Sequence, residues 1–235
     1  MMTIHVLGAI DATTHYGLEA DRAIKNFSDL DEASWAAVAR QSVLGAGPLS
    51  VAAQIPSPDC RRVVLRSGRL PGDDSGLAGS WAGWSPRGKA AFESEIDRLA
   101  PVVARLEFEL ILWPSAGDAL SDIPSCLSFL RRYESGPFRL LIEPAALLAE
   151  SMLPRAAEHL ERIVDSLADH PGVAASMASN VEFHESRGEC VPLGRGSISS
   201  GLIETMVSRL SATSRPLVVR DRDDATTVAR LATKS

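Results

Sequence analysis

The chain has 235 residues, 45% of them hydrophobic, and a formal net charge of −6. These values fit one globular domain over residues 1–235. Because phosphate backbones are bound through basic surface, an acidic chain without a Lys/Arg-rich tract argues against nucleic-acid binding. No run approaches the roughly 18 apolar residues of a membrane span. The N-terminus lacks the pattern of a secretion signal, so we expect a cytoplasmic protein with no membrane partner.

Apolar, β-branched runs recur between helical patterns, an order typical of parallel strands joined by helical crossovers. The first expected strand is 4–10. Asp29-x-x-Glu32 has the form of a helix start and predicts a helix that contains Trp35. The other expected strands are 49–55, 62–67, 108–113, 138–143, 173–177, 181–184 and 216–220.

Three later helices carry start signals. Ser85-Pro86 opens a long one, Pro154 stands at the start of another, and a third begins near Ser199 or Ser200. Repeated strand and helix units over this length predict an α/β fold of the (β/α) barrel type, which typically needs about 250 residues. Three- and four-residue spacing predicts the buried faces of the first two helices, which carry Phe92, Ile96, Leu99, Val103 and Leu106, and Leu160, Ile163 and Leu167, respectively.

Residues 68–85 form the longest segment without a helix or strand pattern, rich in glycine and carrying Trp81 and Trp84. It follows a strand, and the loops after strands build the functional face of a parallel barrel. Flat indole rings suit stacking on a sugar ring. The segment is therefore interpreted as either a lid or a surface insertion, and Trp81, Trp84 and Trp113 as candidate ligand contacts.

The segment 181–198 reads Val-Glu-Phe-His-Glu-Ser-Arg-Gly-Glu-Cys-Val-Pro-Leu-Gly-Arg-Gly-Ser-Ile. It resembles the seventh strand and following loop of the xylose-isomerase-like TIM barrels, a superfamily of sugar-phosphate isomerases and epimerases, inositol dehydratases and AP endonucleases. In that family the strand commonly reads His-x-x-Asp and the loop Leu-Gly-Glu-Gly. The resemblance implies a barrel in which 62–68, 108–114 and 138–144 are the fourth, fifth and sixth strands.

Counting backward makes 49–55 the third strand and 4–10 the second. The barrel then lacks its first βα unit and has seven strands. In the alternative, 4–10 is the first strand and the second lies within 13–27, which gives eight. An incomplete barrel exposes a sheet edge, and such an edge can pair with another chain, so a homodimer is a natural corollary.

The resemblance also implies a divalent ion, Mn, Mg or Zn, held by side chains at the ends of strands five to eight. This chain departs from that pattern. Trp113 stands at the strand-five carboxylate position, Ala146 replaces the strand-six histidine, and Arg220 stands at the strand-eight glutamate. On strand six, Glu143 keeps the carboxylate of the family's aspartate position. For Glu143 a structural ion pair with Arg66 or Arg220 is the alternative to a ligand role.

On strand seven, Glu182 and Glu185 match the family's histidine and aspartate, and His184 lies two residues from the expected histidine position. A shift of two residues keeps a side chain on the same strand face. We expect no cofactor and no bound metal. If an ion is held, Glu143, His184 and Glu185 are the ligands that remain.

Arginines follow several strand ends, namely Arg66, Arg195 and Arg220. The turn 193–196, Leu-Gly-Arg-Gly, also leads toward a helix start. Guanidinium groups and backbone N–H groups at a helix start suit phosphate and carboxylate. The sequence therefore predicts a small-molecule partner that is sugar-like and anionic, bound by arginines in place of a metal.

Two functional interpretations follow. The resemblance implies a divergent sugar phosphate isomerase/epimerase-like protein that acts on or binds a small sugar-like or sugar-phosphate ligand. If it is active, the reaction is proton transfer next to a carbonyl, with Glu143 and Glu185 as the acid/base pair and His184 as a third candidate. The alternative is a catalytically silent barrel that serves as a ligand-binding or partner subunit, which the lost metal ligands favour.

Overall fold

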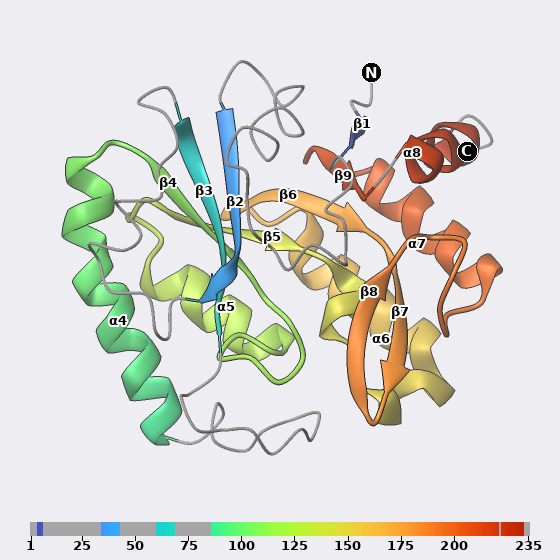
Figure 1. The fold of residues 1–235 in the computed structure, drawn as a ribbon, viewed down its shortest axis with the longest axis horizontal. Helices are drawn as coiled ribbons and strands as arrows, with labels where there is room; N and C mark the ends of the chain where they lie inside the picture. Colours follow the sequence, from blue (N-terminus) through green and yellow to red (C-terminus); the bar gives the residue numbers. More distant parts are fainter. Residues whose placement is uncertain (1–3, 7–33, 43–59, 69–85, 221, 233–235) are drawn as a thin grey trace.

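Seven parallel strands form one curled sheet in the computed structural model, which describes residues 4–6, 34–42, 60–68, 86–220 and 222–232 (Figure 1). Backbone hydrogen bonds join every neighbouring pair in parallel. Over the described residues the first and last strands in the order do not pair with each other, so the sheet is a partial barrel. The order is β1 (Ile4–Val6), β9 (Leu217–Val219), β6 (Val173–Ala178), β5 (Phe138–Ile142), β4 (Glu109–Trp113), β3 (Cys60–Arg66) and β2 (Ser34–Ser42).

Helices pack on the outer face of this sheet. The structure contains α4 (Pro86–Arg105), α5 (Ile123–Arg132), α6 (Ala156–Ile163), α7 (Ser200–Ser211) and α8 (Arg222–Ala232). Short 3₁₀ turns η1 (Pro144–Leu147) and η2 (Glu150–Arg155) precede α6, and the π-helical η3 (Val164–Ala168) continues it. The helices predicted from Ser85-Pro86, Pro154 and Ser199 are confirmed.

The core has two apolar layers because successive strand residues point to opposite faces of the sheet. The outer layer packs against the helices, for example through Leu110, Leu112 and Leu140, which are all fully buried. The inner layer fills the concave side and comprises Val64, Ile111, Trp113, Leu141, Ala175, Met177 and Val218. Burial on both faces explains why the central strands read as continuous apolar runs.

A helix was predicted to follow Asp29 and to contain Trp35. For the described part of that segment the prediction is wrong, because Ser34–Ser42 forms strand β2. Its backbone pairs with β3, with Trp35 opposite Arg62 and Val38 opposite Leu65. Pairing with a neighbouring strand satisfies the backbone polar groups and overrides a local capping signal. The expected strand 49–55 lies outside the described residues.

Leu106 was expected on the buried face of the long helix, but it is 40% exposed. The helix ends at Arg105, and Glu107 adopts a left-handed conformation with φ of 54° that turns the chain toward β4. The other predicted positions of that face, Phe92, Ile96, Leu99 and Val103, are buried as expected.

The prediction that 181–184 is the seventh strand of the barrel is also wrong. This segment forms β7 (Asn180–His184), which pairs antiparallel with β8 (Arg187–Val191) in a hairpin outside the main sheet. Strand β6 takes the place between β5 and β9. Only Ser179 separates β6 from β7, whereas a parallel crossover needs at least about ten residues, so the chain leaves the sheet at this point.

Strand β1 lies beside β9, the last strand of the sheet in sequence order. In a closed barrel the last strand in sequence lies beside the first. This neighbour fits 4–10 as the first strand, and it equally fits 4–10 as the second strand of a barrel that lacks its first βα unit. The residues 13–27 are outside the described part, so the number of barrel strands stays a prediction.

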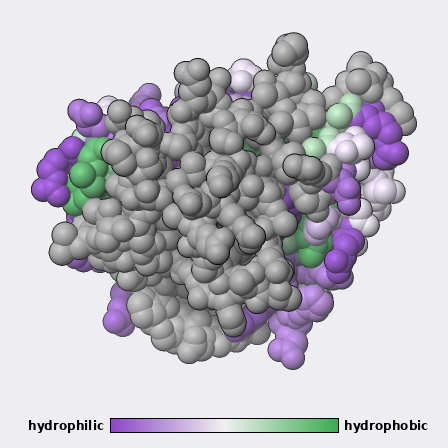
Figure 2. Space-filling view, turned by 45° about the horizontal axis from the view of Figure 1, so that its top comes forward, coloured by the Kyte–Doolittle hydropathy of each residue, from purple (hydrophilic) through white to green (hydrophobic). Residues whose placement is uncertain are grey.

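The described surface on the face seen in Figure 2 is mainly polar. Figure 2 shows hydrophilic side chains over most of the coloured surface, with small separate hydrophobic patches. Within the described part of the chain, no helix combines the length and the apolar content needed to cross a membrane.

The turn after β8 is held by Asn180. Its amide nitrogen donates to the carbonyl oxygen of Ile198 (2.9 Å), and its amide oxygen accepts from the backbone N–H groups of Val181 and Ile198. Gly196 lies against this amide with φ of 100°. A Cβ atom there would be 2.7 Å from the Val181 carbonyl oxygen. Glycine is therefore required at position 196, whereas a Cβ at Gly194 meets nothing within 4 Å.

We expect Gly196→Ala to destabilise the protein by about 1–3 kcal/mol, because the left-handed backbone is strained for alanine and the buried Asn180 must move. Gly194→Ala is the matched control and should change the free energy of unfolding by less than about 0.5 kcal/mol. Urea denaturation of the two variants compares them directly. Equal losses in both would contradict the assignment.

Candidate functional site

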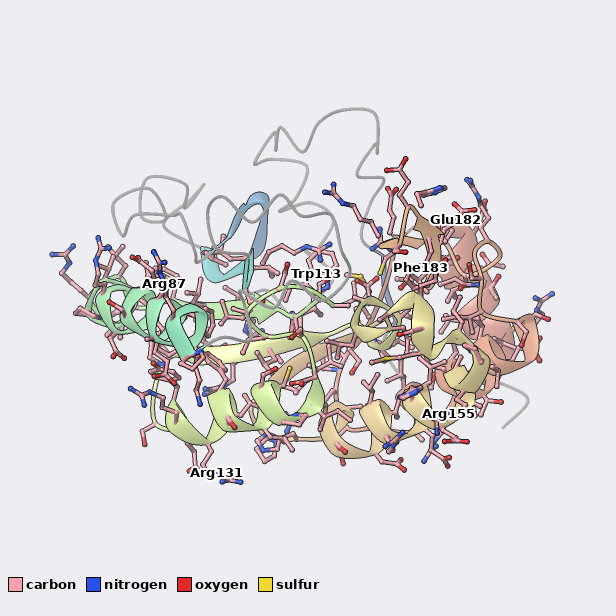
Figure 3. The ribbon with its side chains drawn as sticks, turned by 90° about the horizontal axis from the view of Figure 1, so that it is seen from below. Arg87, Trp113, Arg131, Arg155, Glu182 and Phe183 are labelled. Carbon is pink, nitrogen blue, oxygen red and sulfur yellow. The ribbon has the colours of Figure 1, made fainter. Side chains whose placement is uncertain are left out.

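Polar side chains gather where the parallel strands end. Arg66 ends β3, Trp113 ends β4, Glu143 follows β5 and Arg220 follows β9. In parallel barrels this edge carries the functional groups. Arg66 and Trp113 are direct neighbours in the strand register. In Figure 3 Trp113 lies on the side of the sheet opposite α5 and α6, so the cluster faces the barrel interior.

Glu143 is the centre of this cluster and is completely buried. The Nε1–H group of Trp113 donates to one carboxylate oxygen at 3.0 Å, and a terminal nitrogen of Arg220 donates to the other at 3.0 Å. Both oxygens therefore have a donor. The expected pairing of Glu143 with a nearby arginine is present, with Arg220 as the partner.

Arg66 stacks on the same tryptophan. Its guanidinium carbon lies 4.6 Å from the centroid of the Trp113 ring, within the range of a cation–π contact. Arg66 is partly exposed and makes no hydrogen bond or ion pair with any residue that the structure describes. Trp113 thus contacts the cation through its ring face and the carboxylate through its N–H.

Opposing effects set the pKa of Glu143. Burial by itself raises the pKa, but the positive charges of Arg220 and Arg66 and the hydrogen bond from Arg220 outweigh burial, so the net pKa lies below its usual value. Glu143 is consequently an ionised carboxylate at neutral pH.

Cys190 on β8 and the buried Ser179 complete the surroundings of the carboxylate. Burial, followed by the negative charge of Glu143, raises the pKa of the Cys190 thiol to about 12. Because the thiolate is the nucleophile, this cysteine is not a nucleophile at neutral pH.

The other predicted residues are not brought to this cluster. His184 and Glu185 are exposed at the tip of the β7–β8 hairpin, where His184 Nε2 is 3.6 Å from a carboxylate oxygen of Glu182. No described hydrogen bond or ion pair joins either residue to Glu143. Arg195 is exposed in the turn after β8. Trp81 and Trp84 lie outside the described residues.

The side chains that the structure describes at the strand ends do not fit a divalent ion. Where the structure describes side chains, no group of three or more His, Cys, Asp or Glu residues is placed to hold one. Both oxygens of Glu143 accept hydrogen bonds from N–H groups, and the arginine beside them would repel a cation. Ala146, at the position of the family's histidine, is buried in η1.

Sequence reasoning missed Ser179 and Cys190 as members of the site. Ser179 directly follows β6 and would have been found if 173–178 had been taken as the seventh strand. Cys190 reaches the site only because β8 folds back on β7, with Cys190 opposite Val181. No local pattern indicated that return.

We expect Glu143→Gln to lower the free energy of unfolding by about 3 kcal/mol at pH 7, because it leaves Arg220 without its buried counter-charge. The folded pKa of Glu143 is lowered, so its ionised form contributes stability above the unfolded pKa of about 4.3, and that contribution is lost as the pH falls through the folded pKa. The difference between variant and wild type should therefore shrink below about pH 4.

Urea denaturation at several pH values measures this difference. Glu158→Gln, which removes an exposed carboxylate 3.9 Å from Arg155, is the control and should change stability by at most about 1 kcal/mol. A Glu143→Gln effect that is equally large at pH 3 and pH 7 would rule out the charge pairing as its cause.

Comparisons with known proteins place the fold. Neither a scan against models of protein families nor a search of curated proteins found a match. Among solved structures the chain is similar to the probable 3-DHS dehydratase AsbF from Bacillus anthracis, with a TM-score of 0.55 and 10% identity, covering 100% of this chain and 98% of that one. It is also similar to a D-tagatose 3-epimerase-like protein (TM-score 0.54, 12% identity, 98% and 86% covered).

A further similar structure is an L-ribulose 3-epimerase, with a TM-score of 0.54 and 12% identity, covering 97% of this chain and 76% of that one. A match to a xylose isomerase domain protein from Planctomyces limnophilus spans 59% of that chain, with a TM-score of 0.45. Identities of this size establish the fold alone. The fold expected from the resemblance is confirmed: the chain has the fold of the xylose isomerase-like TIM barrels, in the form of a partial barrel.

Proposed function

We propose that this protein is a catalytically silent barrel that binds a small, anionic, sugar-like molecule at its strand ends without a divalent metal. The observation that carries the proposal is the pairing of Glu143, whose two oxygens are taken by Trp113 and Arg220. The one carboxylate that resembles a family ligand is thus a fixed counter-charge for an arginine.

Proton transfer by Glu143 is poorly supported. A general base works best when its pKa lies near the working pH and when it reaches the substrate proton. Here the pKa is lowered, the side chain is fully buried, and its oxygens already accept hydrogen bonds. The second member of the expected acid/base pair, Glu185, is exposed on the hairpin.

The charges at the strand ends favour an anion. Arg66 carries a positive charge beside this cluster and forms no ion pair with any residue that the structure describes. Arg66 is held in place by the Trp113 ring, and its guanidinium can form two parallel hydrogen bonds with a carboxylate or phosphate. The sugar epimerases among the structural neighbours support a sugar-like body for the ligand.

Arg66→Ala should weaken the binding of a sugar phosphate or sugar acid by about tenfold or more, because a charge-assisted hydrogen bond contributes about 1.5–3 kcal/mol. Isothermal titration with a panel of sugar phosphates, sugar acids and the matching neutral sugars measures the effect. Arg195→Ala removes the same charge from an exposed turn and should leave the affinity unchanged. The anion site is excluded if wild type and Arg66→Ala bind every compound equally.

Metal analysis separates the silent barrel from an active isomerase. After purification and exposure to Mn, Mg or Zn, we expect no stoichiometric metal by mass spectrometry and no rise in the melting temperature that depends on Glu143. Stoichiometric metal that is lost in Glu143→Ala, together with turnover of an aldose or ketose by the wild type, would refute the proposal in favour of catalysis.

A further inference from the structure

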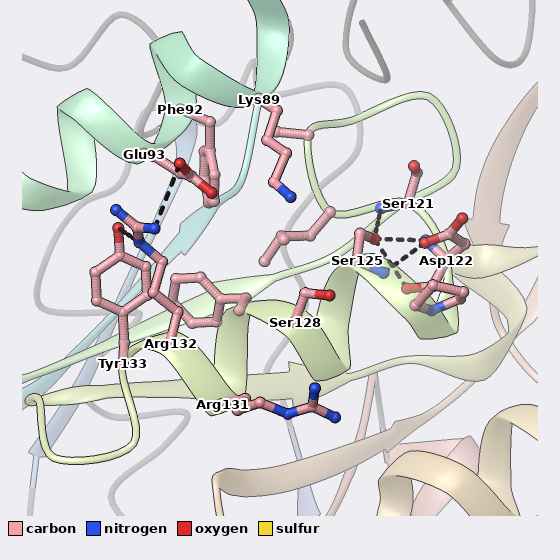
Figure 4. A pocket seen from close by; sticks show the side chains of 14 residues that line it. Lys89, Phe92, Glu93, Ser121, Asp122, Ser125, Ser128, Arg131, Arg132 and Tyr133 are labelled. Atoms are coloured by element: carbon pink, nitrogen blue, oxygen red, sulfur yellow. Dashed lines mark hydrogen bonds and ion pairs between the residues drawn. The ribbon is translucent and has the colours of Figure 1, made fainter. Parts of the chain in front are cut away.

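A cavity lies on the outer side of the sheet, away from the strand-end cluster. It has a volume of about 540 Å³ and is bounded by α4, by α5 and by the loop that leads into α5 (Figure 4). Its lining includes none of Arg66, Trp113, Glu143 or Arg220. Ligand pockets in proteins typically measure about 300–1,000 Å³, so the cavity has the size of a site for a small molecule.

The base of this cavity is apolar and well packed. Phe92 from α4, Leu120 from the loop and Phe129 from α5 line it and are all less than 5% exposed. The rings of Phe92 and Phe129 lie 6.0 Å apart, and Phe129 also packs on Tyr133 at 5.0 Å. Such mutually packed rings offer a rigid apolar surface to a planar or aliphatic group.

The acidic groups of the lining are already engaged. Glu93 forms an ion pair with Arg132 at 3.7 Å, and Asp122 accepts a hydrogen bond from the backbone N–H of Ser125 at 2.8 Å, which caps the start of α5. Neither carboxylate forms an ion pair with Lys89 or Arg131, and the charged side chains of the lining, Lys89, Glu93, Asp122, Arg131 and Arg132, carry a net charge of +1.

Two cations of the lining form no ion pair with a described carboxylate. Lys89 on α4 and Arg131 on α5 are exposed, and neither forms an ion pair with a residue that the structure describes. Figure 4 shows Lys89 extending from α4 toward α5. The exposed hydroxyl of Ser128, also in the lining, is a further donor from α5. The cavity thus joins an apolar base to a positively charged rim.

We propose that this cavity binds a small amphiphilic anion, with an aromatic or acyl body against Phe92, Leu120 and Phe129 and a carboxylate, sulfonate or phosphate at the rim that carries Lys89 and Arg131. The apolar base supplies most of the binding free energy through burial, and the cations discriminate in favour of an anionic head group. This site is separate from the one proposed at the strand ends, and neither depends on the other.

The probe for this site is 1-anilinonaphthalene-8-sulfonate, which has an aromatic body and one sulfonate and becomes fluorescent in apolar surroundings. We expect saturable binding to the folded protein. The uncharged analogue N-phenyl-1-naphthylamine and the double variant Lys89→Ala/Arg131→Ala should each show affinity at least about fivefold weaker, because charge-assisted hydrogen bonds are lost. Ser128→Trp, which fills the cavity from an exposed position, should abolish binding.

The matched control is Arg105→Ala/Arg155→Ala, which removes two exposed positive charges outside the cavity and should bind the probe as the wild type does. Thermal unfolding of each variant checks that the probe reports on folded protein. The proposal is overturned if the two double variants give the same titration curve, or if Ser128→Trp binds as tightly as the wild type. It is also overturned if sedimentation shows a dimer that Ser128→Trp dissociates, because the cavity is then a subunit contact.

Discussion

The pairing of the Glu143 carboxylate is the interaction on which the strand-end region depends. One buried side chain links the ends of three strands, because Trp113 on β4 and Arg220 after β9 both donate to it from either side of β5. Removing a carboxylate from water is costly, and only close partners offset the cost. Arg220 and Trp113, which offset the cost of burying Glu143, also occupy both of its oxygens, and the charge of Arg220 lowers its pKa. Structural support and the loss of a free acid/base group therefore have the same cause.

A second constraint is the short connection after β6. Only Ser179 lies between the end of β6 and the start of β7. This connection is too short for a crossover to another parallel strand, so the chain leaves the sheet and forms a hairpin. The hairpin returns Cys190 to the neighbourhood of Glu143 and places His184 and Glu185 at an exposed tip. Asn180 then fixes the turn that follows, with Gly196 pressed against its amide.

The distribution of charge contrasts with the acidic composition. The chain carries a net charge of −6, yet Arg66 at the strand ends and Lys89 and Arg131 at the outer cavity form no ion pair with any residue that the structure describes. Positive potential concentrated in two small regions of an acidic protein favours small anions and gives little attraction for an extended polyanion. The same contrast is consistent with the absence of any basic tract in the sequence.

Much of the fold was predictable because it rests on local patterns. The apolar runs of β3 to β6 and β9, and the starts of α4, α6 and α7, follow from hydrophobic periodicity and from proline and serine at helix starts. The prediction of a helix around Trp35 was wrong because the pairing of β2 with β3 is a contact between distant segments. The seventh strand was misassigned because the resemblance of 181–198 was given more weight than the apolar run at 173–177.

The sequence by itself determined the fold class, the strand-end position of Arg66, Trp113, Glu143 and Arg220, and the departure of these residues from a set of metal ligands. The type of a residue and its place along a strand are local properties, so both can be predicted from the sequence of one chain. Only the tertiary structure decided that Arg220 pairs with Glu143, that Arg66 stacks on Trp113, and that the hairpin separates His184 and Glu185 from both. Those outcomes depend on distances between strands that are far apart in sequence, and the curvature and order of the sheet set those distances.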